Sequence, residues 1–412
     1  MSEAIEAAHH DAVKDALDWF ENNALLTRLG TDGVQQVDTE GMLAAAFTHR
    51  DSRAGEPDLH THVAISNKVA ATMPDGTTKW LALDGAALYR NNVPASEVYN
   101  TVLEAQLRER IGVRFTERAS TDRSKRPVRE IDGMDERLAE RWSSRSAAIK
   151  LRTAELARAF QADHGREPTA IEAISLAQQA TLETRAAKHE PVSHADQRSG
   201  WRAEAIEILG SQKALSELVS SITAHTAAEA TTDFDRAWVR ETAERSLDIV
   251  SRKRSRFLRH NIRAEVVRQV RTFDPPAERI DALVEKVTDL ACVDELSIDL
   301  SGAADTDPAA DIAPDVMRRR DGADVHTRHE SQLLTTAAVL DAEARIVALA
   351  GRTDGIAIDD KHVEIALLES AANGLDLNAG QRSLVRAMAT SGAKVQLALA
   401  PAGTGKTASM KA

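Results

Sequence analysis

Three histidines on two neighbouring apolar segments restrict the fold of this chain more than any other feature of its sequence. His60 and His62 stand two residues apart at the start of an apolar run typical of a β-strand, so both side chains point to one face. His49 follows the preceding apolar run, residues 42–47, which can pair with that strand as a hairpin. Three imidazoles can then converge on one point and leave open positions for water or a substrate oxygen, as a catalytic metal needs.

The identity of the metal does not follow from these residues. Imidazole suits zinc, nickel, copper or manganese, and the nearby carboxylate of Asp58 widens the choice. The alternative is structural, since a single histidine in a strand is usually an ordinary packing residue. Three histidines clustered at a strand, a loop and a second strand favour metal binding.

Length and composition indicate a globular protein. A chain of 412 residues is long enough for two or three domains, and the abundant Ala, Leu, Glu and Arg favour helix. The single cysteine, Cys292, excludes a disulfide framework, so we expect a cytoplasmic location. The chain has no apolar stretch of membrane-spanning length and no signal peptide, and we therefore expect no membrane insertion.

The formal net charge of −12 argues against a nucleic-acid coat protein that works by bulk charge, but it allows local basic patches. The two candidates are residues 114–129 and 252–271, both rich in arginine. For the second, helical spacing slightly favours a solvated helix face over a nucleic-acid contact.

Apolar periodicity and turn residues predict a mixed α+β unit over residues 1–115, and a mainly helical region over 116–300. In the first we expect helices over 3–22 and 94–111, a hairpin over 25–37, and strands over 63–70 and 78–83. In the second we expect helices over 135–162, 170–188, 200–209, 213–230, 233–271 and 276–291. The acidic, Pro- and Ala-rich residues 301–329 predict a flexible linker, and residues 330–373 return to helix with a short interruption over 352–358.

A second motif lies at the end of the chain. An apolar strand over 394–399 leads into a glycine-rich loop that contains Gly403 and Gly405 and ends in Lys406-Thr407. Such a P-loop surrounds phosphates with backbone N–H groups, while the lysine neutralises charge and the hydroxyl binds Mg²⁺. Ala400 replaces the usual first glycine. Upstream, Gln381 can meet an adenine edge, or it can simply follow Asn378 at a capped helix N-terminus.

Both motifs in this order resemble one family, the MobF-type (TrwC-, TraI- and TraA-like) conjugative relaxase-helicases. The resemblance covers essentially the whole chain. The matching stretches are 47–62 with the three histidines, 83–90, 168–172, 178–185 and the P-loop 400–407.

The resemblance implies a fold and a set of domains. We expect an HUH-type α+β relaxase palm with an incomplete antiparallel sheet over 1–115 and a helical middle region over 116–300. The linker over 301–329 then leads into 330–412, which ends in the first strand and P-loop of a superfamily-1 α/β helicase domain of the AAA type.

The resemblance also implies an activity, namely site- and strand-specific nicking of single-stranded origin-of-transfer DNA by metal-assisted transesterification, fused to an ATP-dependent helicase. The divalent metal ligands would be His49, His60 and His62. ATP with Mg²⁺ would be bound by Gly403, Thr404, Gly405, Lys406 and Thr407, helped by Gln381. DNA is the expected partner, and the conjugative transfer machinery is a possible second one.

The family's nucleophilic tyrosines have no counterpart in this sequence. Tyr89 and Tyr99 are the only tyrosines, and both are interpreted as packing residues, so no catalytic residue is predicted. We therefore expect a fragment truncated at both ends and catalytically incomplete. The alternative is a non-catalytic DNA- or partner-binding remnant of such a protein. A cupin- or hydrolase-like metalloenzyme is less favoured, since an acidic fourth ligand is missing.

Overall fold

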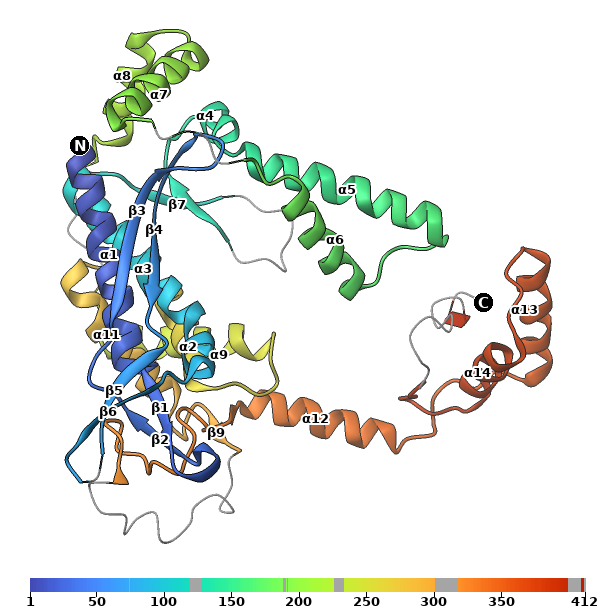
Figure 1. Cartoon of the computed structure of the whole chain (residues 1–412). Helices are drawn as coiled ribbons and strands as arrows, with labels where there is room; N and C mark the ends of the chain where they lie inside the picture. The colour runs from blue at the N-terminus through green and yellow to red at the C-terminus, as the bar shows by residue number, and fades with distance from the viewer. Residues whose placement is uncertain are drawn as a thin grey trace. The chain divides into compact units, whose positions relative to one another are not determined.

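The computed structural model describes residues 1–73, 75–118, 127–187, 190, 192–225, 233–300, 317–398 and 409–410, which form two compact units. Unit 1 contains the described residues within 1–250, 258–292 and 301–332. Unit 2 contains those within 251–257, 293–300 and 333–412. Figure 1 labels the elements of both.

Unit 1 starts with helix α1 and continues in antiparallel strand pairs. The strands are β1 (Leu26–Leu29) with β2 (Gln35–Asp38), β3 (Ala44–Asp51) with β4 (Pro57–Ile65), β5 (Lys68–Thr72) with β6 (Thr78–Ala82), and β7 (Phe115–Glu117) with β8 (Arg129–Ile131). The accompanying helices are α1 (Ser2–Asn23), η1 (Thr31–Gly33), α2 (Gly85–Arg90) and α3 (Asn92–Ile111). The predicted α+β character is confirmed, but within the described residues the strands form separate pairs instead of one sheet.

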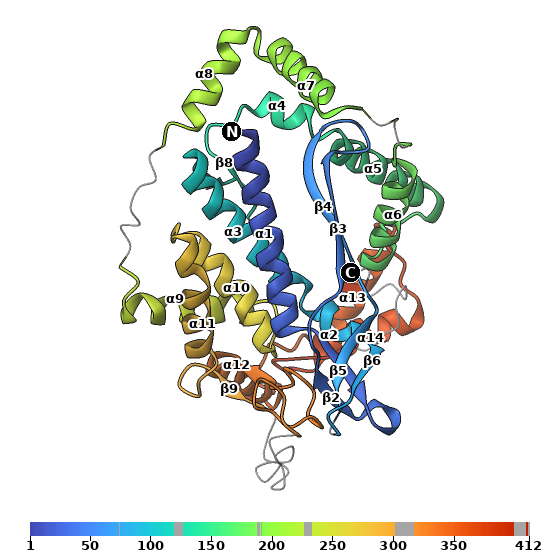
Figure 2. The ribbon, with the colours of Figure 1, turned by 60° about the vertical axis from the view of Figure 1, so that its left-hand side comes forward.

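Helix α1 lies between α3 and the β3–β4 pair, as Figure 2 shows. Its apolar stripe packs Ala8 against Leu107 and Val113 of the α3 region, with Ile5 at the edge of this cluster. Helix α3 ends at Gly112, whose φ of 68° is left-handed. A Cβ at Gly112 would lie 2.5 Å from the carbonyl oxygen of His225, so only glycine fits.

The helical middle region is confirmed, although two of its predicted helices are broken. The observed helices are α4 (Glu136–Arg141), α5 (Ser144–His164), α6 (Ala170–Glu183), α7 (His194–Leu209), α8 (Gln212–Ile222), α9 (Arg236–Ser251), α10 (Arg259–Arg271), η2 (Ala277–Arg279) and α11 (Ile280–Ala291). The predicted helix over 135–162 breaks at Trp142, whose indole N–H donates to Glu204 (2.8 Å). The predicted helix over 233–271 breaks before Phe257, whose N–H and C=O both bond to Leu334.

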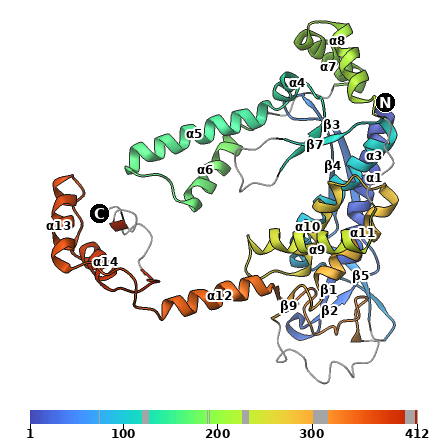
Figure 3. The same cartoon turned by 180° about the vertical axis from the view of Figure 1, so that it is seen from behind.

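The arginines of α10 do not form the solvated face that their spacing favoured. Arg268 is 8% exposed, and its Nε donates to Glu97 on α3 over 2.8 Å. Arg271 pairs with Glu97 at 3.2 Å and approaches Glu104 at 3.6 Å. Figure 3 shows α10 beside α3. These arginines therefore hold two helices together, because carboxylates distant in sequence face them.

The expected flexible linker is wrong for its described part, residues 317–329. Arg319 is 4% exposed, and its Nη1 donates to the backbone oxygens of Gln36, Asp324 and Thr327. Val325 is also buried, and its carbonyl accepts from the Gln36 N–H over 2.7 Å. The segment thus packs on β2. The acidic residues 301–316 lie outside the described residues.

Unit 2 is mostly helical. Its elements are β9 (Ile298–Asp299) paired with β10 (Leu334–Thr335), α12 (Ala337–Ala350), α13 (Asp360–Ala372) and α14 (Ala379–Thr390). Val363, Leu367 and Leu377 form a small core. The predicted strand over 394–399 is not formed in residues 394–398, and Leu397 is 82% exposed. A strand needs a neighbour to pair its backbone groups, and these residues have no strand partner within the described chain.

Candidate metal centre

The three histidines share one face of the β3–β4 pair. In the antiparallel register His49 lies opposite His60, and Phe47 lies opposite His62. Opposed residues point to the same face, and side chains alternate along each strand, so the three imidazoles stand together. The hairpin and the shared face predicted from the sequence are confirmed.

The imidazole rings lie at the separation that one shared ion requires. Their centroids are 5.4 Å apart for His49 and His60, 5.3 Å for His49 and His62, and 5.0 Å for His60 and His62. A metal nitrogen bond of about 2.0–2.1 Å puts ring centres about 5.2 Å apart at a tetrahedral angle. Among the described residues, however, no three His, Cys, Asp or Glu side chains already have their donor atoms arranged as a metal site. The three rings are thus close together, but their donor atoms do not form a metal site in this structure.

The backbone fixes the tautomer of His60. Its Nδ1 lies 2.8 Å from the carbonyl oxygen of Asp58, and a carbonyl only accepts, so Nδ1 carries the proton. The lone pair is then on Nε2, where a metal can bind. This is the orienting contact that metal-binding histidines normally have. The side chain of Asp58 is close as well, with its Oδ2 3.5 Å from the same nitrogen.

The imidazole face lines a cavity of about 1090 Å³ with several basic side chains. Arg53 comes from the β3–β4 loop, Arg145 and Lys150 from α5, and Arg185 from the segment after α6. All but Arg53 are exposed, and none of the four forms an ion pair with a described carboxylate. The carboxylates of Asp51, Glu56 and Asp58 line the same cavity, so four basic side chains face three acidic ones there. The exposed, unpaired cations on α5 and after α6 can still contact a polyanion such as a nucleic-acid backbone.

The loop between β3 and β4 is held by residues that the sequence analysis did not identify. The Trp201 indole N–H donates to the Gly55 carbonyl (2.7 Å), and the Ser144 N–H donates to Glu56 (3.0 Å). Gln197 donates to Asp51 (2.8 Å). These contacts join α5 and α7 to the loop and so form the far wall of the cavity. No local sequence pattern marks them, since the partners lie about a hundred residues away.

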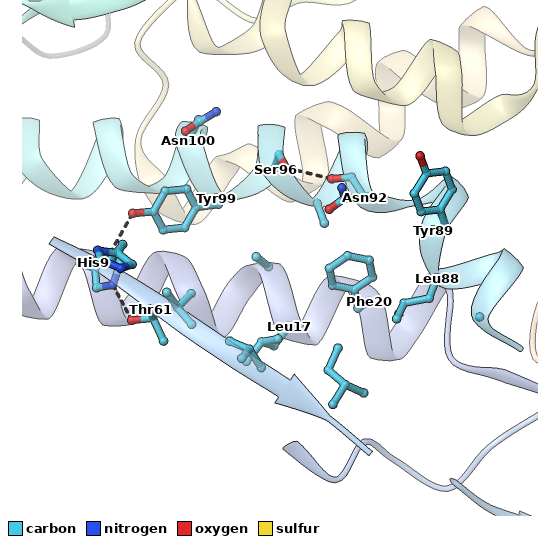
Figure 4. Close-up of a pocket in the computed structure, with 17 residues that line it drawn as sticks. His9, Leu17, Phe20, Thr61, Leu88, Tyr89, Asn92, Ser96, Tyr99 and Asn100 are labelled. Atoms are coloured by element: carbon cyan, nitrogen blue, oxygen red, sulfur yellow. Dashed lines mark hydrogen bonds between the residues drawn. The ribbon is translucent and has the colours of Figure 1, made fainter. Parts of the chain in front are cut away.

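Both tyrosines lie on a second cavity, of about 840 Å³, between α1, α3 and β4. Figure 4 shows Tyr99 beside His9 at one end and Tyr89 at the other. The Tyr99 hydroxyl bonds to His9 Nδ1 over 2.8 Å, and burial raises the pKa of Tyr99. Its interpretation as a packing residue holds. Tyr89 is 82% exposed, so the same interpretation is wrong for Tyr89.

Only one predicted nucleotide-binding residue lies within the described chain. Gln381 completes a capping box at the start of α14, because its Oε1 accepts from the Asn378 N–H while its own N–H bonds to Asn378 Oδ1. The capping alternative is therefore present in the structure. Gly403, Thr404, Gly405, Lys406 and Thr407 lie outside the described residues.

The chain thus combines antiparallel strand pairs, a face with three histidines and a helical region, which is the α+β architecture expected for a relaxase. The family model described as TrwC relaxase matches residues 1–208, about half of the chain, and the chain belongs to this family. The match begins at the first residue and extends beyond β8 to α7. A model described as an AAA domain matches residues 376–412. No described helix has the length and apolar character needed to span a membrane.

Two curated relatives are each a multifunctional conjugation protein TraI. One, from Escherichia coli, is 33% identical over 147 residues, which are 35% of this chain and 8% of that protein. The other, from Escherichia coli strain K12, is 34% identical over 108 residues, which are 25% of this chain and 6% of that protein. The chain thus matches only a small part of these relatives' length.

Solved structures of TrwC are similar to part of the chain. TrwC bound to a 27-mer DNA with the recognition hairpin and cleavage site is 27% identical, covering 49% of this chain and 65% of that one, with a TM-score of 0.38. A copper-bound TrwC structure with origin-of-transfer DNA is 26% identical, covering 50% and 63%, with a TM-score of 0.39.

Proposed function

We propose that this chain is the part of a conjugative relaxase that binds single-stranded origin-of-transfer DNA and places its scissile phosphate beside a divalent metal held by His49, His60 and His62. The observation that carries the proposal is the set of three ring centroids 5.0–5.4 Å apart on one strand-pair face. Membership of the TrwC relaxase family supports the assignment of these rings to DNA chemistry.

The residues of the chain divide this work between them. Arg145, Lys150 and Arg185 line the cavity with the imidazoles and would hold the phosphates that flank the reacting one. The hydrogen bond from His60 Nδ1 to the Asp58 carbonyl would leave Nε2 free to bind the ion. A bound divalent ion would act as a Lewis acid on the phosphate oxygens.

We also propose that the nucleophile comes from outside the residues of this chain. The Tyr99 hydroxyl is engaged by His9, and Tyr89 lines the cavity between α1, α3 and β4 instead of the imidazole cavity. The same observation favours the second candidate function, a non-catalytic DNA-binding remnant. Incubation with a single-stranded oligonucleotide and Mg²⁺ separates this proposal from a complete enzyme. We expect no covalent adduct, and an adduct at Tyr89 or Tyr99 would contradict the proposal.

The C-terminal residues are proposed to begin an ATP-dependent helicase domain. The AAA-domain match over 376–412 supports ATP and Mg²⁺ binding by Gly403–Thr407. The role of Gln381 at the adenine and the cytoplasmic location stay predictions.

Calorimetric titration with Mn²⁺ tests the metal centre. We expect His60→Ala to weaken Mn²⁺ binding by more than about 100-fold, because loss of a ligand should exceed the 10–100-fold effect of losing an outer contact. His362→Ala, an exposed histidine on α13, is the matched control and should bind as the unaltered chain does. Equal affinity of the His60→Ala and control variants would rule out the triad.

A further inference from the structure

A buried histidine lies behind the imidazole face. His9 on α1 is 2% exposed, and both of its ring nitrogens are hydrogen-bonded. Nδ1 lies 2.8 Å from the Tyr99 hydroxyl on α3, and Nε2 lies 2.7 Å from Thr61 Oγ1 on β4. Burial and the neighbouring His10 and His60 lower the pKa of His9, so its ring is neutral, with one nitrogen donating and the other accepting.

The hydrogen bonds continue from His9 across the strand pair. Thr61 Oγ1 lies 3.0 Å from Thr48 Oγ1, and these two residues are opposed in the register. Thr61 stands between His60 and His62, and Thr48 directly precedes His49. Because side chains alternate, the threonines point toward the helices while the three histidines point to the other face.

The β3–β4 pair is only partly stabilised by its own backbone hydrogen bonds. The β3–β4 pair has no third strand within the described residues, and its register shifts between His49 and Asp51. A two-stranded pair needs packing against other elements to be stable. Helix α1 has two other side-chain contacts to this part of β3. Glu6 accepts from Arg50 over 2.8 Å and 3.1 Å at a partly exposed position, and His10 Nε2 lies 3.5 Å from Thr48 Oγ1.

We propose that His9 is a positioning residue for the metal ligands, fixing through Thr61 and Thr48 where the two strands hold His49, His60 and His62. This inference rests on the proposed metal centre. The residue touches no metal and no substrate. It acts because the chain of side chains from Tyr99 to Thr48 ties α3 and α1 to both strands at the points that flank the three imidazoles.

Titration with Co²⁺ tests the role, since the visible absorption of bound Co²⁺ reports ligand geometry as well as affinity. We expect His9→Phe and Thr61→Val to weaken Co²⁺ binding 10–100-fold and to change the absorption spectrum. His9→Gln, whose amide can still bond to a threonine hydroxyl, should recover part of the affinity. Tyr99→Phe removes one outer bond and serves as the mild variant if His9→Phe folds poorly.

Leu107→Ala is the matched control. Leu107 belongs to the α1–α3 core but not to the hydrogen-bonded chain, so its truncation should lower the melting temperature and leave Co²⁺ affinity within about twofold. Equal loss of affinity in Leu107→Ala and His9→Phe would reduce His9 to a general stabilising residue and overturn the inference. Unaltered Co²⁺ binding by His9→Phe would overturn the positioning role of His9 but not the proposed metal centre. If the unaltered chain does not bind Co²⁺, both the metal centre and the role of His9 are overturned.

Discussion

Arg145 and Lys150 on α5 are exposed and line the cavity with the three imidazoles, whereas Arg268 on α10 is buried, and Arg271 mostly buried, against α3. Both regions are rich in basic residues, and both lie on helices. What separates them is ion pairing. Arg268 and Arg271 pair with carboxylates of α3, whereas Arg145 and Lys150 form no ion pair with a described carboxylate, although Asp51, Glu56 and Asp58 line the same cavity. Charge density in a sequence therefore identifies a candidate surface, and the partner decides whether that surface is free to bind a polyanion.

The largest expected effect is on the buried side of this comparison. Arg268→Ala leaves the buried Glu265 without its paired cation and Glu97 with Arg271 alone, and should lower the free energy of unfolding by about 3–5 kcal/mol. Denaturant unfolding followed by circular dichroism measures it. Arg240→Ala on α9, whose pair with Glu244 is exposed, is the control and should cost at most about 1 kcal/mol. If instead Arg268→Ala kept full stability and lost DNA affinity, α10 would be a DNA surface and the distinction would fail.

A smaller effect is expected on the exposed side. The double variant Arg145→Gln and Lys150→Gln removes two phosphate contacts, so the dependence of log affinity on log salt should become shallower by about 1.4 for single-stranded DNA. Fluorescence anisotropy at several salt concentrations measures this slope. Lys213→Gln, an exposed lysine on α8 outside the cavity, should leave the slope unchanged. An equal change in both variants would mean that the cavity is not the binding surface.

The smallest expected effect is a change in how stability depends on pH, caused by the mostly buried His329 at the end of residues 317–329. Burial lowers the pKa of His329, whose N–H also bonds to Gln36. A histidine that is buried neutral binds its proton more readily in the unfolded chain, so its contribution to stability is complete above about pH 6.5 and is lost as the pH falls. Between pH 7.5 and pH 5 we expect His329→Phe to lose less stability than the unaltered chain. Parallel stability curves would show that this segment is not packed as described.

Some features of the fold were predictable because they depend on neighbours in sequence. The helix over 3–22, the hairpin over 25–37 and the end of a helix at Gly112 all agree with the structure, since apolar spacing and glycine conformation act locally. The predicted helices over 135–162 and 233–271 were too long. Trp142 and Phe257 interrupt them through bonds to Glu204 and Leu334, and a periodicity argument has no access to such distant partners.

The candidate site shows the same division. The shared face of His49, His60 and His62 follows from strand alternation and a hairpin register, so the sequence alone determined it. His9, the clamp of Trp201 on Gly55, and the opposite environments of Arg145 and Arg268 were decided by the tertiary structure. The physical reason is that hydrogen bonds and ion pairs between distant segments depend on how helices pack around the strands, and no local spacing encodes which carboxylate, carbonyl or hydroxyl a side chain will meet.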